Sequence, residues 1–287
     1  MNDSLQPGFS VTGPCDGRSP LVFTSPHSGR DYPAAFLAVT RLPIAQLRHA
    51  EDAMVDQLLC GIDSAPVMRA RYARTFLDLN RAADEIDAAM FNSTPDLPMR
   101  RTDRVIAGLG VVPRIAARGE EIYAGRIDAA DAAVRIAALH VPWHGRIATL
   151  IDHARSRHGH AILIDCHSMP TPAGLRSPQI VLGDRHGVTA APALIRLIER
   201  HFGSFGWRVA RNIPYAGGYT TEAHGAVAAG VHAVQIEIDR ALYMDPITLQ
   251  RGSGFGSVAD AMTGLARLLA AASQVLPLVP TQRDAAE

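Results

Sequence analysis

The sequence predicts an α/β fold with a mixed, largely parallel sheet. Short apolar runs that resemble buried strands alternate along the chain with segments whose apolar residues recur every three or four positions. Such alternation is typical of helices layered on a parallel sheet. The chain has 287 residues, of which 47% are hydrophobic, and this is ample for the core of one large domain.

The strands are predicted from short apolar runs bounded by glycine or proline. They are residues 20–25, 65–72, 75–80, 160–166, 178–183, 207–211 and 231–238. We expect the closely spaced pair 65–72 and 75–80 to form an antiparallel element.

Helices are predicted where apolar residues recur at helical spacing, within 44–62, 147–154, 194–198 and 258–269. Gly159 is expected to end the second of these helices. Residues 91–126 are rich in proline, glycine and charge, and we expect an excursion across one end of the sheet that covers a site. A single domain is expected over 1–275, followed by a loose tail over 276–287.

Composition restricts the possible partners. The chain carries 28 Lys and Arg against 28 Asp and Glu, so its charge gives no reason to expect binding to nucleic acid or to an anionic membrane. No apolar run approaches the roughly 18 residues that span a bilayer, and the first residues do not resemble a signal peptide. Three cysteines without a C-x-x-C motif favour a reducing compartment. We therefore expect a soluble cytoplasmic protein, with an oligomeric state that the sequence does not indicate.

Two histidines follow predicted strands directly. His27 comes after the run "LVFTSP", and His167 comes after "AILIDC". In open α/β sheets ligands bind outside the carboxyl ends of the strands, and neutral imidazole is a common metal ligand. The alternative is that each histidine only hydrogen-bonds a nearby turn. Asp165, two residues before His167, could orient that ring.

A catalytic zinc site usually has three protein ligands, so a third is expected. The segment "HAEDAMVDQLL" offers His49, Glu51, Asp52 and Asp56. Asp52 could instead be the N-cap of a helix. Spacing alone does not choose between Glu51 and Asp52.

Glu237 lies between Ile236 and Ile238 in an apolar run. A buried carboxylate is costly unless it is paired or has a function, and such a group can act as a general base beside a metal. The alternative is a salt bridge to an arginine.

Other polar residues suggest a substrate site. Arg74, Asn80 and Arg81 could bind a small acidic substrate, or they could form a solvated charged turn. The segment 214–225 combines a Gly-Gly bend with His224, which could contact a ligand.

Five motifs occur in an order that resembles the N-formylglutamate amidohydrolase family, from about residue 20 to 270. They are "PHSG", "ARTFLDLNRAAD", "ILIDCHSMP", "AGGYTTEAHG" and "VHAVQIEIDRALYMD". The resemblance implies a three-layer α/β/α sandwich similar to zinc carboxypeptidases and aspartoacylases. One departure is Glu222, which stands where the family often has a cation.

The resemblance also implies residue roles. The zinc ligands would be His27, Asp52 and His167, and it therefore favours Asp52 over Glu51. Glu237 would be the base that activates water. Arg74, Asn80 and Arg81 would hold a substrate carboxylate. From the chemistry of amide hydrolysis, we also expect an arginine or His224 to stabilise the oxyanion.

The implied reaction is hydrolysis of N-formyl-L-glutamate to glutamate and formate, a late step of one route of histidine degradation. Two alternatives remain. One is a hydrolase of another N-acyl amino acid or short peptide, and the other is a non-catalytic metal-binding protein on the same scaffold.

Overall fold

A computed structural model describes residues 5–94, 96–174 and 176–278. The chain forms two compact units. The first comprises Met1–Ser10, Pro26–Ala53 and Arg69–Arg146, and the second comprises Val11–Ser25, Met54–Met68 and Ile147–Glu287. Within the described residues, no helix is both long enough and apolar enough to cross a membrane.

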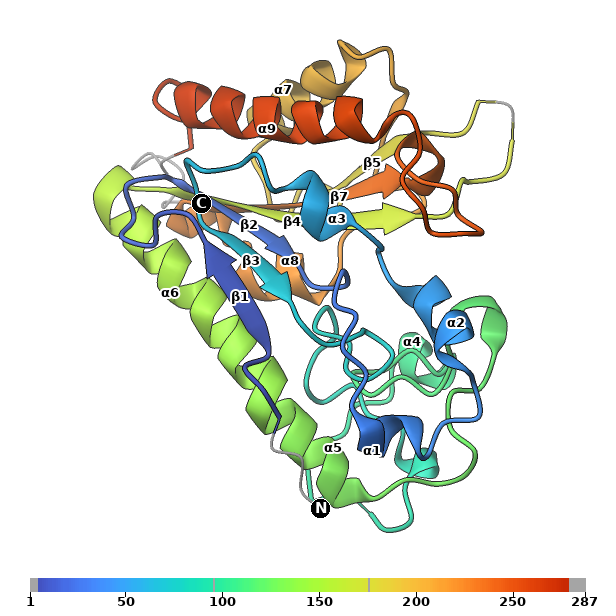
Figure 1. Cartoon of the computed structure of the whole chain (residues 1–287). Helices are drawn as coiled ribbons and strands as arrows, with labels where there is room; N and C mark the ends of the chain where they lie inside the picture. Colours follow the sequence, from blue (N-terminus) through green and yellow to red (C-terminus); the bar gives the residue numbers. More distant parts are fainter. Residues whose placement is uncertain (1–4, 95, 175, 279–287) are drawn as a thin grey trace. The chain divides into compact units, whose positions relative to one another are not determined.

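The seven strands of the sheet confirm the α/β class (Figure 1). They are β1 Phe9–Thr12, β2 Leu21–Ser25, β3 Val67–Ala70, β4 Ala161–Met169, β5 Ile180–Gly183, β6 Val209–Arg211 and β7 Val231–Asp239. Their order is β1-β3-β2-β4-β7-β5-β6. The pairs β2–β4, β4–β7 and β5–β6 are parallel, whereas β5 and β7 are antiparallel, so the sheet is mixed.

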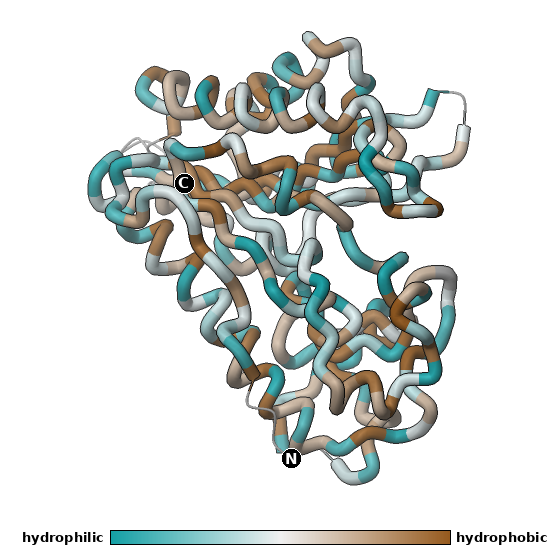
Figure 2. The backbone as a smooth tube through the Cα atoms, viewed as in Figure 1, coloured by the Kyte–Doolittle hydropathy of each residue, from teal (hydrophilic) through white to brown (hydrophobic). Residues whose placement is uncertain are grey.

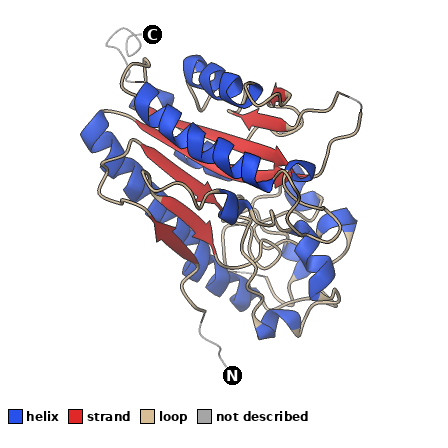
Figure 3. Cartoon of the chain, turned by 45° about the horizontal axis from the view of Figure 1, so that its top comes forward, coloured by secondary structure: helices blue, strands red, loops and turns tan. Residues whose placement is uncertain are grey.

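Helices flank the sheet in the second unit. They are α3 Val55–Leu58, α6 Val141–His158 (which begins in the first unit), α7 Pro192–Gly203, α8 Tyr219–His224 and α9 Phe255–Ala272. In Figure 1, α7 and α9 lie on one side of the sheet and α6 and α8 lie on the other. Figure 3 shows α9 crossing in front of the strands. The sheet of the second unit therefore lies between two helical layers, as the resemblance implies.

Strands β4 and β7 lie in the core of the second unit. All nine residues of β4 and all nine of β7 are buried. Helix α9 adds a stripe of buried apolar residues that includes Val258, Met262 and Leu265. Figure 2 shows hydrophobic residues concentrated along the sheet and on α9. Buried apolar area of this kind is the main stabilising contribution to folding.

The first unit is built mainly from loops and short helices. They are α1 Ala34–Leu37, α2 Ile44–Leu47, η1 Arg48–Ala50, η2 Ala88–Met90, α4 Asp103–Ile106, η3 Ala117–Gly119, α5 Ala129–Arg135 and the π-helical segment Ile136–His140. Its core includes Phe36 against Phe76 and the buried Arg135 guanidinium over the Phe76 ring. Residues 91–94 and 96–126 are largely irregular apart from α4 and η3.

Several sequence predictions about elements were wrong. Residues 75–80 do not form a strand, because Phe76 and Leu77 both bond back to the carbonyl of Ala73 in a turn. The apolar side chains there reflect a buried turn. The predicted helix 44–62 is interrupted between η1 and α3, where Met54 adopts a left-handed φ of 63°.

Other elements differ at their ends or were not predicted. Met54 is the N-cap of α3, so Asp52 does not cap that helix. Strand β1 and helix α8 were not predicted. Gly159 does end α6, with φ 73° and an N–H bonded to Arg155. Of the expected tail, residues 279–287 lie outside the described residues, and Leu278 before them is buried.

Candidate active site

The carboxyl halves of β4 and β7 place four polar side chains together in the second unit. In their parallel register Asp165 lies opposite Gln235, and His167 lies opposite Glu237. Residues two apart on a strand point to the same face, so all four share one face of the sheet. All four are buried. Buried polar groups in this number need partners, and the strands supply them.

Each pair forms a hydrogen bond along its own strand. Asp165 Oδ2 lies 2.8 Å from His167 Nε2, and Gln235 Nε2 donates to Glu237 Oε1 at 2.7 Å. On the neighbouring strand β2, the Thr24 hydroxyl donates to Asp165 Oδ1 at 2.6 Å. The orientations of the His167 ring and the Glu237 carboxylate are therefore both constrained from two residues upstream.

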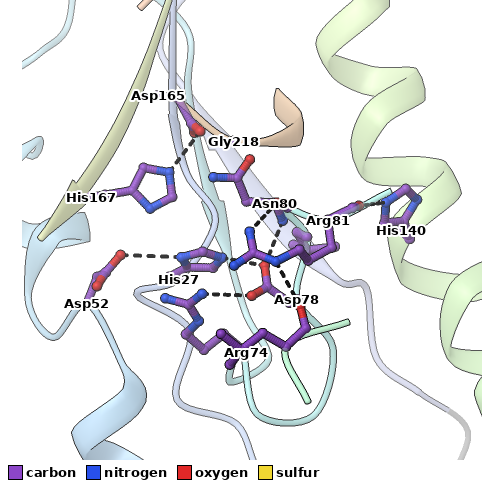
Figure 4. A network of polar contacts seen from close by, with 12 residues as sticks. His27, Asp52, Arg74, Asp78, Asn80, Arg81, His140, Asp165, His167 and Gly218 are labelled. Atoms are coloured by element: carbon purple, nitrogen blue, oxygen red, sulfur yellow. Dashed lines mark hydrogen bonds and ion pairs between the residues drawn. The ribbon is translucent and has the colours of Figure 1, made fainter. Parts of the chain in front are cut away.

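His27 lies in the first unit, just after the end of β2, and has a carboxylate at each ring nitrogen (Figure 4). Its Nε2 atom is 2.7 Å from Asp78 Oδ1, and its Nδ1 atom is 3.4 Å from Asp52 Oδ2. The backbone N–H of Asp52 also donates to the His27 carbonyl at 2.9 Å. This backbone bond holds the segment between η1 and α3 against the His27 backbone, and the Asp52 side chain therefore lies beside the His27 ring.

Asp78 is held as an anion by its surroundings. Burial alone would raise the pKa of Asp78, but Arg74, His27 and Arg81 outweigh it and keep this pKa well below its usual value. Arg74 donates to Oδ2 at 2.7 Å, and the backbone N–H of Asn80 donates to Oδ1 at 2.9 Å. An ionised Asp78 accepts a hydrogen bond from Nε2–H of His27, which leaves Nδ1 as the nitrogen that can ligate a metal.

His27, Asp52 and His167 form a buried group that could hold a metal ion. Each offers one ligand atom, and these atoms lie within 4.8 Å of one another. Two donors at about 2.0 to 2.1 Å from zinc are roughly 3.3 Å apart at a tetrahedral angle, and the 3.4 Å between His27 and Asp52 matches this. Metal-ligating imidazoles usually contact a carboxylate through the other nitrogen, as Asp78 and Asp165 do here. The donor set fits zinc.

Glu51, the alternative to Asp52, has other partners. The Tyr32 hydroxyl donates to Glu51 Oε1 at 2.6 Å, and Arg48 approaches Oε2 at 3.5 Å. Burial raises the pKa of Glu51, and Tyr32 and Arg48 oppose this effect. His49, Glu51 and Asp56 do not belong to the candidate metal group, which contains Asp52.

The Arg74, Asn80 and Arg81 cluster combines a buried asparagine with two half-buried arginines. Asn80 is only 3% exposed. Arg81 donates through Nε to the Leu109 carbonyl at 2.9 Å and through Nη1 to the Asn80 carbonyl at 2.8 Å. Burial lowers the pKa of Arg81, while the Asp78 carboxylate raises it. A cationic cluster held this firmly is suited to bind an anion.

Sequence reasoning missed two histidines that support this cluster. His140 Nε2 bonds the carbonyl of Arg81 at 2.8 Å, and His144 Nε2 bonds the carbonyl of Leu79 at 2.9 Å (Figure 4 includes His140). Their rings lie 4.4 Å apart. The signal in the sequence was their i, i+4 spacing, which places them on one face of a helix. The structure adds a π-helical segment that ends at His140, and such segments are frequent at functional sites.

Helix α8 carries the remaining predicted residue. His224 is its last residue and is half-buried. Just before α8, the backbone N–H of Gly218 donates to Gln235 Oε1 at 2.8 Å. Glu222, the departure from the family pattern, pairs with Arg185 at 3.1 Å, so its charge is balanced locally.

The fold and this group of side chains define an α/β protein with a candidate metal centre at the carboxyl edge of its sheet. A family model described as N-formylglutamate amidohydrolase matches residues 19–244. The chain belongs to this family, which confirms the resemblance seen in the sequence.

Individual relatives agree with this assignment. N-formylglutamate deformylase of Pseudomonas aeruginosa is 29% identical over 239 residues, covering 80% of this chain and 84% of the relative. The protein of the same name from Pseudomonas putida is 28% identical, with 80% and 83% covered.

Solved structures support the same fold. The crystal structure of N-formylglutamate amidohydrolase from Ralstonia eutropha has a TM-score of 0.88 and 30% identity, with 94% of this chain and 99% of that chain covered. A gene product of Agrobacterium tumefaciens shares the fold, with a TM-score of 0.65, 19% identity and coverage of 92% and 94%.

Proposed function

We propose that the chain is a metal-dependent amidohydrolase that cleaves N-formyl-L-glutamate into glutamate and formate. The observation that carries the proposal is the buried His27, Asp52 and His167 group, with Glu237 opposite His167 in the neighbouring strand. Relatives named N-formylglutamate deformylase support the substrate and the reaction.

The three ligands would hold one divalent cation, with zinc as the first candidate. When bound, such a cation polarises a carbonyl oxygen and makes water more acidic. Asp78 and Asp165 orient the two imidazoles. Proton transfer, substrate binding and oxyanion stabilisation are assigned to other side chains of this protein.

Glu237 is the proposed general base. It accepts a proton from the water that attacks the formyl carbon, and it then passes a proton to the amine as the C–N bond breaks. Its burial and its position beside His167 support this role, because a carboxylate in such a place can exchange protons without competition from bulk water.

Arg74, Asn80 and Arg81 are proposed to bind a substrate carboxylate, and His224 or an arginine is proposed to stabilise the oxyanion. A guanidinium carries five N–H donors, so Arg74 can hold Asp78 and a substrate carboxylate together. Holding the substrate by its carboxylate places the amide for attack.

A substrate comparison tests the proposal. Formate release is measured from N-formyl-L-glutamate, N-formyl-L-aspartate and N-formyl-L-leucine, and acetate release from N-acetyl-L-glutamate, each with zinc and with a chelator. We expect the highest kcat/KM for N-formyl-L-glutamate and loss of turnover with the chelator. A preference for N-formyl-L-leucine or N-acetyl-L-glutamate would indicate another N-acyl amino-acid hydrolase. No turnover of any of the four by the zinc-loaded protein would favour a metal-binding protein without catalysis.

A further inference from the structure

We propose that Gln235 is a positioning residue that orients Glu237 for proton transfer; this inference rests on the proposed function. Gln235 is 4% exposed and lies two residues before Glu237 on β7, on the same face of the sheet. Its side-chain amide bonds on both sides. Nε2 donates to Glu237 Oε1 at 2.7 Å, and Oε1 accepts the Gly218 N–H at 2.8 Å.

The two bonds together fix which way the amide points. The Gly218 N–H can only donate, so the atom that faces it must be the amide oxygen. The amide nitrogen must then face Glu237, whose carboxylate accepts. Gln235 therefore links the Gly218 backbone, just before α8, to the Glu237 carboxylate and fixes the orientation of that carboxylate.

The adjoining strand repeats the arrangement. Asp165 is the register partner of Gln235 and bonds to His167, just as Gln235 bonds to Glu237. One row of side chains across β4 and β7 thus orients the next row, which contains the proposed metal ligand and the proposed base. Residues that orient catalytic groups in this way commonly affect activity strongly.

An amide suits position 235 better than a carboxylate. It donates to Glu237 without adding charge, whereas two buried carboxylates at this distance would force one of them to hold a proton. Strand β5, on the other side of β7, leaves room for the backbone that contacts Gln235. The β5 register partner of Gln235 is Gly183, which has no side chain. A Cβ at Gly183 would lie 2.5 Å from the Gly217 backbone nitrogen, so glycine lets this backbone approach.

The first test is Gln235→Met, which keeps the size of the side chain and removes both bonds. We expect kcat to fall about 10- to 100-fold, with KM and bound zinc within about twofold of the unchanged protein. The control is Gln179→Met on the segment before β5, where the side chain accepts the Arg208 N–H at 3.3 Å. It should leave kcat unchanged.

A double-mutant cycle shows whether Gln235 acts through Glu237. If it does, adding Gln235→Met to Glu237→Gln should lower the residual rate no further. Gln235→Glu, which is nearly isosteric, should also lower kcat while leaving folding and zinc content intact. A full additional loss in the double variant would overturn the inference, because Gln235 would then act independently of Glu237.

The outcomes separate this inference from the proposed function. If Glu237→Gln is as active as the unchanged protein, the base assignment fails and the role of Gln235 fails with it. If Glu237→Gln is inactive and Gln235→Met is fully active, only the role of Gln235 is wrong. If both Gln235 variants unfold or lose zinc, Gln235 supports the fold alone and the inference is again wrong.

Discussion

At the scale of single residues, the candidate metal centre is defined as much by its carboxylates as by its imidazoles. Asp78 and Asp165 each contact Nε2 of a histidine in the candidate metal group. Each contact fixes a ring in place and makes its other nitrogen a better donor to a cation. The sequence pointed to Asp165, which precedes His167 by two positions. It did not point to Asp78, because nothing local connects residue 78 with residue 27.

Asp78→Asn tests this support directly. We expect zinc affinity to fall about 10- to 100-fold, because the amide is a weaker partner for His27 and no longer balances Arg74. Competition with a chromophoric chelator measures the change. Asp84→Asn is the control, since Asp84 pairs with Arg100 near the surface. Equal zinc affinity in Asp78→Asn and the unchanged protein would contradict the assigned role.

At the scale of elements, the strands of the sheet were predicted better than the segments between them, although β4 runs on to Met169 and so contains His167 where the prediction ended the strand before it. The strands that carry His167 and Glu237 were recognised because their apolar runs are long and buried. The turn at 75–80 was mistaken for a strand because its apolar residues pack in the first unit like those of a strand. Helix α8 was not predicted because its Gly-Gly start resembles a loop, and tertiary contacts to β4 and β7 stabilise it.

Gly183→Ala tests the close approach of β5 to the backbone at residues 216–217. The added methyl would meet the Gly217 nitrogen at 2.5 Å and the Ala216 carbonyl carbon at 2.7 Å. We expect a loss of about 1 to 3 kcal/mol in unfolding free energy and a lower kcat, since Gly218 would shift from Gln235. Gly203→Ala in α7 is the control, because nothing lies within 4 Å of its added methyl. Denaturant melts that show equal stability for both variants would rule out this account.

At the scale of the whole molecule, the sequence predicted the fold class and, together with the resemblance, the three residues of the candidate metal group. Hydrophobic periodicity reports whether a segment is buried, whereas the grouping of segments depends on interactions between distant residues. The same limit explains why the choice between Glu51 and Asp52 needed the resemblance. The two neighbouring carboxylates have different tertiary partners: Glu51 meets the Tyr32 hydroxyl, whereas Asp52 meets the His27 ring.

Buried histidines also predict how global stability depends on pH. Burial lowers the pKa of His232 below its usual 6.5. Its Nδ1 accepts the Ala191 N–H at 3.2 Å, so the ring must be neutral, and its Nε2 donates to the Leu278 carbonyl at 2.9 Å. Because the folded pKa is depressed, this contribution is fully present above about pH 6.5 and is lost as pH falls through the folded pKa.

We therefore expect the melting temperature of the unchanged protein to fall as the pH is lowered from about 7 to 5. The melting temperature of His232→Gln should be lower at pH 7 and should fall less steeply over the same range. Thermal melts of the metal-free protein across this range measure both effects, and they keep metal release out of the comparison. Parallel curves for the two proteins would show that His232 does not contribute to the acid sensitivity.

The central claim is that one cation, held by His27, Asp52 and His167, is required for hydrolysis. The most direct measurement titrates zinc into chelator-treated protein and records bound zinc and formate release from N-formyl-L-glutamate in the same samples. The account predicts that the rate rises with bound zinc to a plateau at about one ion per chain, and that Asp52→Asn shows neither tight zinc binding nor the rise. Full turnover by the zinc-free protein, or tight zinc binding that Asp52→Asn leaves unchanged, would contradict it.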